Sequence, residues 1–136
     1  MILQVGVKVL LKNKEGKFLL IRRNPKKYPD VGPQWDIVGG RIEPGASLLE
    51  NLKREVREEV GLELFAPVEL IAAQDIIRPD RHVVRLTYTG EIEGEPKLDE
   101  ESTEFKWFTG EEIKQLKDGQ LDKYFKELLE TGEISI

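Results

Sequence analysis

A stretch near the middle of the chain combines a helical repeat of apolar residues with a dense run of charged ones. Ser47 stands where a helix N-cap would, Glu50 follows at the spacing of a capping box, and Gly61 comes directly after the last periodic residue. The spacing therefore predicts a helix over 48–60. One face of this helix should pack on a core, and its carboxylate edge should lie at a cleft. The apolar face consists of Leu48, Leu49, Leu52, Val56 and Val60.

Three carboxylates on the predicted helix are spaced to act together. Glu55 and Glu59 lie one turn apart and Glu58 precedes Glu59, so the three side chains are expected to converge on one patch. Like charges this close destabilise an isolated helix, which favours a hard divalent cation bound among them. Arg54 lies one turn before Glu58 and should hydrogen-bond its carboxylate. The pattern thus predicts a metal site at the edge of the helix.

The same stretch resembles the Nudix box, written G-x5-E-x7-R-E-U-x-E-E-x-G-U, in which U is a bulky aliphatic residue. Eight of its nine defined positions match, and the miss is the first glutamate, which falls on Ala46. The resemblance implies an α/β fold, an α/β/α sandwich with a mixed β-sheet. It also implies hydrolysis of the diphosphate linkage of a nucleoside diphosphate joined to another moiety, with Mg²⁺ or Mn²⁺ as cofactor. The matching residues are Gly40, Arg54, Glu55, Val56, Glu58, Glu59, Gly61 and Leu62.

The resemblance also implies a role for each matching polar residue. In the family, the carbonyl at the position of Gly40 commonly helps to bind the metal. Glu55 and Glu59 would then be metal ligands, Glu58 a ligand or the general base, and Arg54 the residue that orients a carboxylate. A divalent cation held there would neutralise phosphate charge and lower the pKa of a bound water molecule.

Some family members place the general base on a distant loop instead. Glu100, Glu101 and Glu104 are the candidates here, and Glu104 is favoured because it lies nearest Trp107 in the sequence. Each of them alone is typical of a surface acid. The sequence does not decide which residue is the base.

The missing box glutamate allows a second hypothesis from another class of protein. In the family this glutamate generally supports the site, often through the arginine, so Ala46 bears on the rate more than on the existence of activity. Glu43 is near enough in the sequence to take its place. The alternative is a catalytically weak Nudix domain that binds a nucleotide as a sensor or scaffold. The retention of Arg54 and all three later carboxylates argues against it.

Two basic segments are candidates for substrate binding. The segment Arg22–Pro33 contains three prolines and a glycine and is predicted to be a loop. The cations at its start are typical of a solvated surface, but Arg22 or Arg23 could instead bind a substrate phosphate through paired guanidinium donors. His82, in a second predicted loop over 76–82, could touch substrate, although a lone loop histidine is more often incidental.

The rest of the chain alternates in the manner of strands and then ends in helical patterns. The first two predicted strands should form a hairpin, since a glycine-containing turn joins them. Residues 62–74 predict one long strand or two broken ones. Trp35 is predicted to be a packing residue. The other predicted elements are strands over 4–11, 18–21, 35–38, 83–92 and 105–108 and helices over 111–116 and 121–129.

Length and charge narrow the classes of protein further. A chain of 136 residues fits a single domain spanning 1–136, and its net charge of −5 argues against general binding to nucleic acid or membrane surfaces. The absence of cysteine excludes a thiol nucleophile and disfavours the isopentenyl diphosphate isomerases of the family. We find no signal peptide and no spanning segment, so a cytoplasmic location is expected. A homodimer is possible, and nothing in the sequence decides it.

The substrate is expected to be a small-molecule nucleotide. Pro79 lies seventeen residues after Leu62, close to the spacing of about sixteen found in ADP-ribose hydrolases of the family. ADP-ribose or another nucleotide sugar is therefore favoured, ahead of oxidised nucleoside triphosphates.

Overall fold

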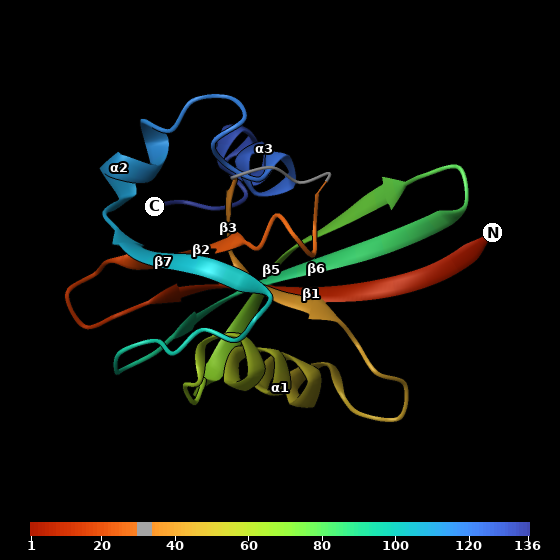
Figure 1. Ribbon diagram of the computed structural model, residues 1–136, viewed down its shortest axis with the longest axis horizontal. Helices are drawn as coiled ribbons and strands as arrows, with labels where there is room; N and C mark the ends of the chain where they lie inside the picture. The colour runs from red at the N-terminus through yellow and green to blue at the C-terminus, as the bar shows by residue number, and fades with distance from the viewer. Residues whose placement is uncertain (30–33) are drawn as a thin grey trace.

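A computed structural model describes residues 1–29 and 34–136, which form one mixed β-sheet with helices on both faces (Figure 1). One helix packs on one face and two helices lie over the other, which confirms the predicted α/β/α sandwich. Residues 30–33, the last part of the predicted loop, lie outside the described residues. The helices are α1 (Leu48–Val60), α2 (Gly110–Lys114) and α3 (Lys123–Thr131).

The sheet contains the strands β1 (Ile2–Lys12), β2 (Phe18–Arg23), β3 (Trp35–Asp36), β4 (Val38–Arg41), β5 (Phe65–Ile77), β6 (Arg81–Glu91) and β7 (Ser102–Phe108). Their main order is β3-β2-β1-β6-β5, with β4 paired to β1 and β7 paired to β2. β1 runs parallel to β6 along its whole length and antiparallel to β2 and β4. The central strand therefore pairs directly with β2, β4 and β6, and the other strands join the sheet through β2 and β6.

α1 begins and ends where the sequence predicted. The Ser47 hydroxyl accepts a hydrogen bond from the backbone N–H of Glu50 at 3.1 Å, and Gly61 ends the helix in a left-handed conformation with φ of 68°. The predicted apolar stripe is narrower than expected, because Leu48 and Leu49 are each 38% exposed. The core against α1 starts only at Leu52, one turn into the helix.

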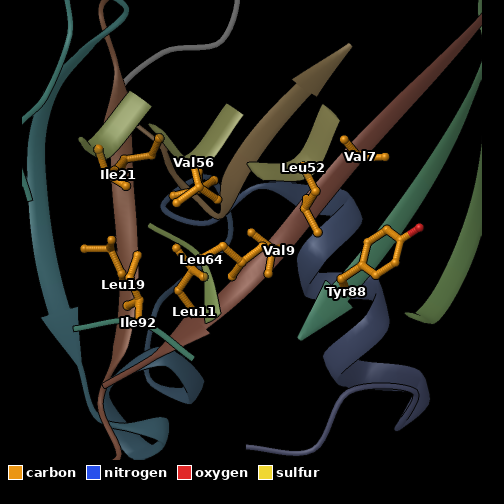
Figure 2. Close-up of a cluster of buried hydrophobic side chains, with 12 residues drawn as sticks. Val7, Val9, Leu11, Leu19, Ile21, Leu52, Val56, Leu64, Tyr88 and Ile92 are labelled. Carbon is orange, nitrogen blue, oxygen red and sulfur yellow. The ribbon is translucent and has the colours of Figure 1, made fainter. Parts of the chain in front are cut away.

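Side chains of β1 alternate between two cores, one on each face of the sheet. Val7, Val9 and Leu11 pack with α1, and Figure 2 shows them facing Leu52 and Val56. The next residues point the other way, so Leu10 joins the core under α2 and α3. Lys8 shares that second face and brings a charge into it. Trp35 is buried in the same core, as predicted, and its ring meets Phe108 edge-on.

Two predicted loops are replaced by strand. β2 continues through Arg22 and Arg23, because both residues pair with β7, so the loop that follows starts later than predicted. The predicted loop over 76–82 is a tight hairpin in which the N–H of Arg78 bonds the carbonyl of Arg81 at 2.8 Å. His82 consequently lies in β6, paired with Ile77 of β5.

The remaining elements follow the predicted order with shifted ends. β5 is one strand with two irregularities in its register, which decides between the one long strand and two broken strands that the sequence allowed. α3 starts two residues later than expected, because Asp122 is its N-cap and accepts a hydrogen bond from the N–H of Phe125 at 3.0 Å. Within the described residues, no helix is both long enough and apolar enough to cross a membrane.

Candidate active site

The carboxylate edge of α1 faces a polar cavity of about 630 Å³. β4 and the following loop, residues 42–47 (the box loop), close one side of this cavity, and residues of β1, β2 and β3 extend it across the sheet. Its lining contains far more charge than either core. The lining residues are Lys8, Arg23, Tyr28, Asp36, Gly39, Gly40, Arg41, Ile42, Glu43, Arg54, Glu55, Glu58, Glu101 and Asp122.

Two glycines bring the backbone of β4 against α1. Gly39 has φ of 144°, and a Cβ there would lie 2.1 Å from the carbonyl oxygen of Val7. At Gly40 a Cβ would lie 2.7 Å from Oε2 of Glu55. Gly40 pairs with Val7 of β1 and Gly39 with Lys8, and this pairing holds the glycine segment of β4 close to the helix. Only glycine allows this approach.

The carboxylate of Glu59 is bonded to this glycine segment and to Arg23. Its Oε1 accepts a hydrogen bond from the N–H of Gly39 at 2.7 Å, and its Oε2 forms an ion pair with Arg23. Arg23 also donates to the carbonyl of Gly39 at 3.0 Å. Burial raises the pKa of Glu59, while Arg23 and Lys8 oppose the rise. Burial alone would lower the pKa of Arg23, but the neighbouring carboxylates outweigh it and raise that pKa.

Arg54 connects the other two carboxylates. Its Nη1 donates to Glu55 at 2.9 Å and to Glu58 at 3.2 Å, the second of which confirms the predicted contact one turn along the helix. Glu55 is buried, whereas the side chain of Glu58 is 56% exposed. Burial raises the pKa of Glu55, and the charge of Glu59 adds to the rise. The three carboxylates therefore differ strongly in their access to water.

The three carboxylates bond to two arginines and do not converge on one shared point. Glu55 and Glu58 share Arg54, and Glu59 turns toward Arg23 and Gly39. Across the described ranges 1–29 and 34–136, no three acidic or histidine side chains stand close enough together to enclose a cation. Arg23 and Arg54 offset part of the charge of the three carboxylates.

The box loop is tied to α1 by a residue that the sequence interpretation missed. The amide of Asn51 accepts from the N–H of Glu43 at 2.7 Å and from Nη2 of Arg54 at 2.9 Å. It donates to the carbonyls of Ser47 at 2.9 Å and Ala46 at 3.2 Å, with a longer contact of 3.4 Å to that of Glu43. Asparagine is a poor helix former, so its place inside a predicted helix was the available signal.

A second missed feature is a buried charge cluster on the opposite face of the sheet. Lys8 Nζ lies 3.0 Å from Asp36, and Arg85 Nη1 lies 3.0 Å from Asp122. Arg85 Nη2 joins the two pairs, at 3.5 Å from Asp36. Burial raises the pKa of Asp122, whereas Lys8 and Arg85 overcome burial at Asp36 and lower its pKa. Isolated charges in apolar strands, such as Lys8 within β1, could have signalled this cluster.

The structure places the other predicted site residues in different surroundings. Arg22 pairs with Glu104 at 2.9 Å and lies over the ring of Trp35, with 4.3 Å to the ring centroid. His82 bonds Asp75 at 2.7 Å on the β5–β6 hairpin. Neither Arg22, Glu104 nor His82 belongs to the cavity lining among the described residues.

The three acids predicted to lie on a loop also separate, because Glu104 lies within β7, where it pairs with Arg22 of β2. Glu101 lines the cavity, Glu100 pairs with Lys27 at 2.8 Å, and Glu104 is held by Arg22. Of the predicted residues, the structure therefore brings Arg23, Gly40, Arg54, Glu55 and Glu58 together in the cavity lining, with Glu59 directly behind them.

The α/β/α sandwich places the glutamates of α1 against the two glycines of β4, and both the fold and this site point to one protein family. The family model described as the NUDIX domain matches residues 2–129. The chain belongs to the Nudix family. Among solved structures, the MutT protein from Methanosarcina mazei Go1 is similar with a TM-score of 0.83 and 27% identity, covering 96% of this chain and 92% of that one.

Curated relatives match over shorter stretches. The NAD-capped RNA hydrolase NudC of Stutzerimonas stutzeri is 36% identical over 98 residues, which cover 68% of this chain and 32% of that protein. The CTP pyrophosphohydrolase of Escherichia coli is 42% identical over 50 residues, covering 37% of this chain and 36% of that protein. The chain thus spans about a third of the length of these two relatives.

Proposed function

We propose that the chain is a metal-dependent pyrophosphohydrolase that cleaves the diphosphate linkage of a nucleotide. The observation that carries the proposal is the cavity that Arg54, Glu55 and Glu58 line together with Gly39 and Gly40 of β4. Membership of the Nudix family and the hydrolase names of the relatives support it.

Nudix hydrolases generally use divalent metal ions, and the residues here fit such an ion in two respects. The donors are carboxylate and carbonyl oxygens, which Mg²⁺ and Mn²⁺ prefer. Because Gly40 has no side chain, the Glu55 carboxylate can lie directly against the β4 backbone, where a Cβ would be 2.7 Å from its Oε2. We therefore propose Gly40, Glu55, Glu58 and Glu59 as the residues that hold the metal. When bound, it would neutralise phosphate charge and lower the pKa of a water molecule.

Glu58 is the side chain best suited to accept the proton of the attacking water. It is the most exposed of the three helix carboxylates, and Arg54 holds it at the cavity. A base on the loop before β7 is the alternative. Glu101 now fits that role better than Glu104, because Glu101 lines the cavity while Glu104 pairs with Arg22.

Substrate contact is assigned most directly to Arg23. It lines the cavity beside the proposed metal residues, so its charge can attract a phosphate as well as Glu59. Arg22 and His82 would reach a substrate only by leaving Glu104 and Asp75. Arg23 and Arg54 both line the cavity among its carboxylates, so they supply the positive charge that a phosphate group needs.

A nucleoside triphosphate is the substrate class that we now place first. The E. coli relative is named for CTP, which is a nucleoside triphosphate. ADP-ribose was favoured by the position of Pro79, but that residue lies in the turn between β5 and β6, away from the cavity lining. Both classes belong in the test.

The test measures phosphate and nucleotide release from nucleoside triphosphates, ADP-ribose, nucleotide sugars and dinucleotides, with Mg²⁺, with Mn²⁺ and in chelator. Turnover should require the metal, and Glu58→Gln should lower kcat by at least about a hundredfold, the scale for one positioned catalytic group. Glu101→Gln and Glu104→Gln should cost less.

Glu63→Gln is the matched control, since Glu63 is an exposed acid that pairs with Arg57 just beyond α1. Its turnover should stay within about twofold of wild type. Metal-independent hydrolysis, or a Glu58→Gln variant with normal kcat, would contradict the site. A nucleotide that raises the melting temperature without being turned over would support a nucleotide-binding domain instead. The loss of the box glutamate at Ala46 would then explain the lack of turnover.

A further inference from the structure

Asn51 is the most heavily bonded side chain at the site, and it is not part of the box pattern. It is only 1% exposed and uses both ends of its amide. Its oxygen accepts from Arg54 and from the backbone of Glu43, and its nitrogen donates to carbonyls of the box loop. Burying an amide costs free energy unless its hydrogen bonds are made, and here they are made to the loop and to Arg54.

These bonds connect three parts of the site. Nη2 of Arg54 donates to the side-chain oxygen of Asn51, while its Nη1 donates to both Glu55 and Glu58. Nη2 also donates to the carbonyl of Arg41 at the end of β4. Both terminal nitrogens of the guanidinium, Nη1 and Nη2, donate hydrogen bonds, so the plane of the group is fixed. Its orientation in turn positions the two carboxylates that Nη1 contacts.

The box position that would normally support this arginine is Ala46, which has no polar side chain to offer. Glu43 is near enough in the sequence to take its place, but its carboxylate is 71% exposed and stays 3.8 Å from Arg54 Nη1. Asn51 bonds both the arginine and the carbonyl of Ala46 itself. We propose that Asn51 is a positioning residue that holds Arg54 and the box loop in place of the glutamate missing at position 46.

This inference rests on the proposed function, and its test uses metal affinity as well as turnover. Asn51→Ala should lower kcat and weaken Mn²⁺ binding, measured by calorimetric titration, by about 10- to 100-fold each, the range for partners of metal-binding side chains. KM should change far less than kcat. Ala46→Glu alone should have little effect, but in the Asn51→Ala background it should restore most of both losses.

Asn13→Ala is the matched control, because Asn13 also holds a turn by accepting two backbone hydrogen bonds, far from the cavity. It should lower the melting temperature while kcat and Mn²⁺ affinity stay at the wild-type values. If Asn51→Ala behaves in the same way, Asn51 is merely structural and the proposal is wrong. Failure of Ala46→Glu to rescue Asn51→Ala would also overturn it.

Asn51→Asp separates the two halves of the proposed role and covers the case in which Asn51→Ala does not fold. It keeps an oxygen for Arg54 but loses the donors to the loop carbonyls, so it should be less stable than wild type yet retain most of the Mn²⁺ affinity. A loss of affinity as large as that of Asn51→Ala would contradict the proposal. Absence of turnover in the wild type would refute the proposed function alone, and absence of Mn²⁺ binding would refute both.

Discussion

Glu55 and Glu59 are acids that folding removes from water, and each is stabilised by a cation that comes from elsewhere in the site. Arg54 bonds Glu55, and Arg23 forms an ion pair with Glu59. Burying a carboxylate favours its protonated form, and the opposing charges recover only part of that cost. Without a bound metal, burying these two carboxylates therefore imposes a free-energy penalty on folding at neutral pH.

This penalty predicts a pH dependence of the metal-free protein. Above the ordinary glutamate pKa of 4.5 an unfolded glutamate is ionised, while folded Glu55, with its raised pKa, keeps its proton longer. The folded state then binds more protons, so stability falls as the pH rises from 4.5 through the raised value. In chelator, Glu55→Gln should flatten this fall in melting temperature and should be more stable than wild type at pH 7.

Glu63→Gln again provides the control for the melting series. Arg57 lowers the pKa of Glu63, so this carboxylate acts below the window in question. Its variant should keep the wild-type slope above pH 4.5. A Glu55→Gln variant whose melting temperature follows wild type across that range would show that Glu55 is not under the strain described.

Residue pairs could be predicted from the sequence only where the chain is local. Arg54 and Glu58 are one helical turn apart, so their contact followed from helix geometry. Arg23 and Glu59 are separated by 36 positions, and Lys8 and Asp36 by 28. Such pairs depend on which elements are neighbours in the fold, which a single sequence specifies poorly. The interpretation therefore found the carboxylates and Arg54, but it missed the pairing of Arg23 with Glu59 and of Lys8 with Asp36.

At the scale of elements, α1 shows how burial divides residues that look alike in the sequence. Leu49 and Leu52 belong to the same predicted stripe, yet Leu49 is partly exposed and Leu52 is fully buried. Leu52 packs with Val7 and Val9 of the central strand (Figure 2). The helix is therefore anchored from its second turn onward, and its first turn depends on the Ser47 cap and the box loop.

The two leucines give a matched pair of substitutions. Leu52→Ala should lower the free energy of unfolding by about 3 kcal/mol, because it leaves a cavity in a fully packed core. Leu49→Ala removes the same atoms from a partly exposed site and should cost less than about 1 kcal/mol. Urea denaturation measures both values. Equal costs would mean that the first turn of α1 is packed as tightly as the second.

Element types were predicted well and element ends less well, for a physical reason. α1 was placed correctly because its caps and its periodicity lie within its own residues. β2 runs on through Arg23, and His82 is strand instead of loop, because partner strands extend them. A run of charged residues beside prolines favours a loop locally, but pairing with β7 and β5 outweighs that preference.

At the scale of the whole molecule, the buried charge cluster joins elements from both halves of the chain. Lys8 belongs to β1, Asp36 to β3 and Arg85 to β6, and Asp122 caps α3. The cluster therefore couples the helix layer to three strands at the rear of the cavity. The cluster has two cations and two carboxylates, so removing one member leaves an unbalanced charge among buried groups.

Asp122→Ala should reveal this coupling. It removes the N-cap of α3, worth about 1 kcal/mol, and also strips Arg85 of its 3.0 Å partner, so the total loss should be about 3 kcal/mol or more. Thr109→Ala removes the comparable N-cap of α2 without touching a buried charge and should cost only about 1 kcal/mol. Equal losses in urea denaturation would mean that the cluster contributes nothing beyond the cap.

The parallel pairing of β1 with β6 also constrains how the protein is made. Ile2 pairs with Arg81 and Lys12 with Glu91, so β1 finds its full-length neighbour only after α1 and β5, which lie between the two strands in the sequence, have been translated. Until then the nascent chain can form the β1–β2 hairpin and α1, but one side of its central strand stays open on the ribosome. The charge cluster of Lys8, Asp36 and Arg85 is therefore completed late, because its fourth member, Asp122, follows β6 in the sequence.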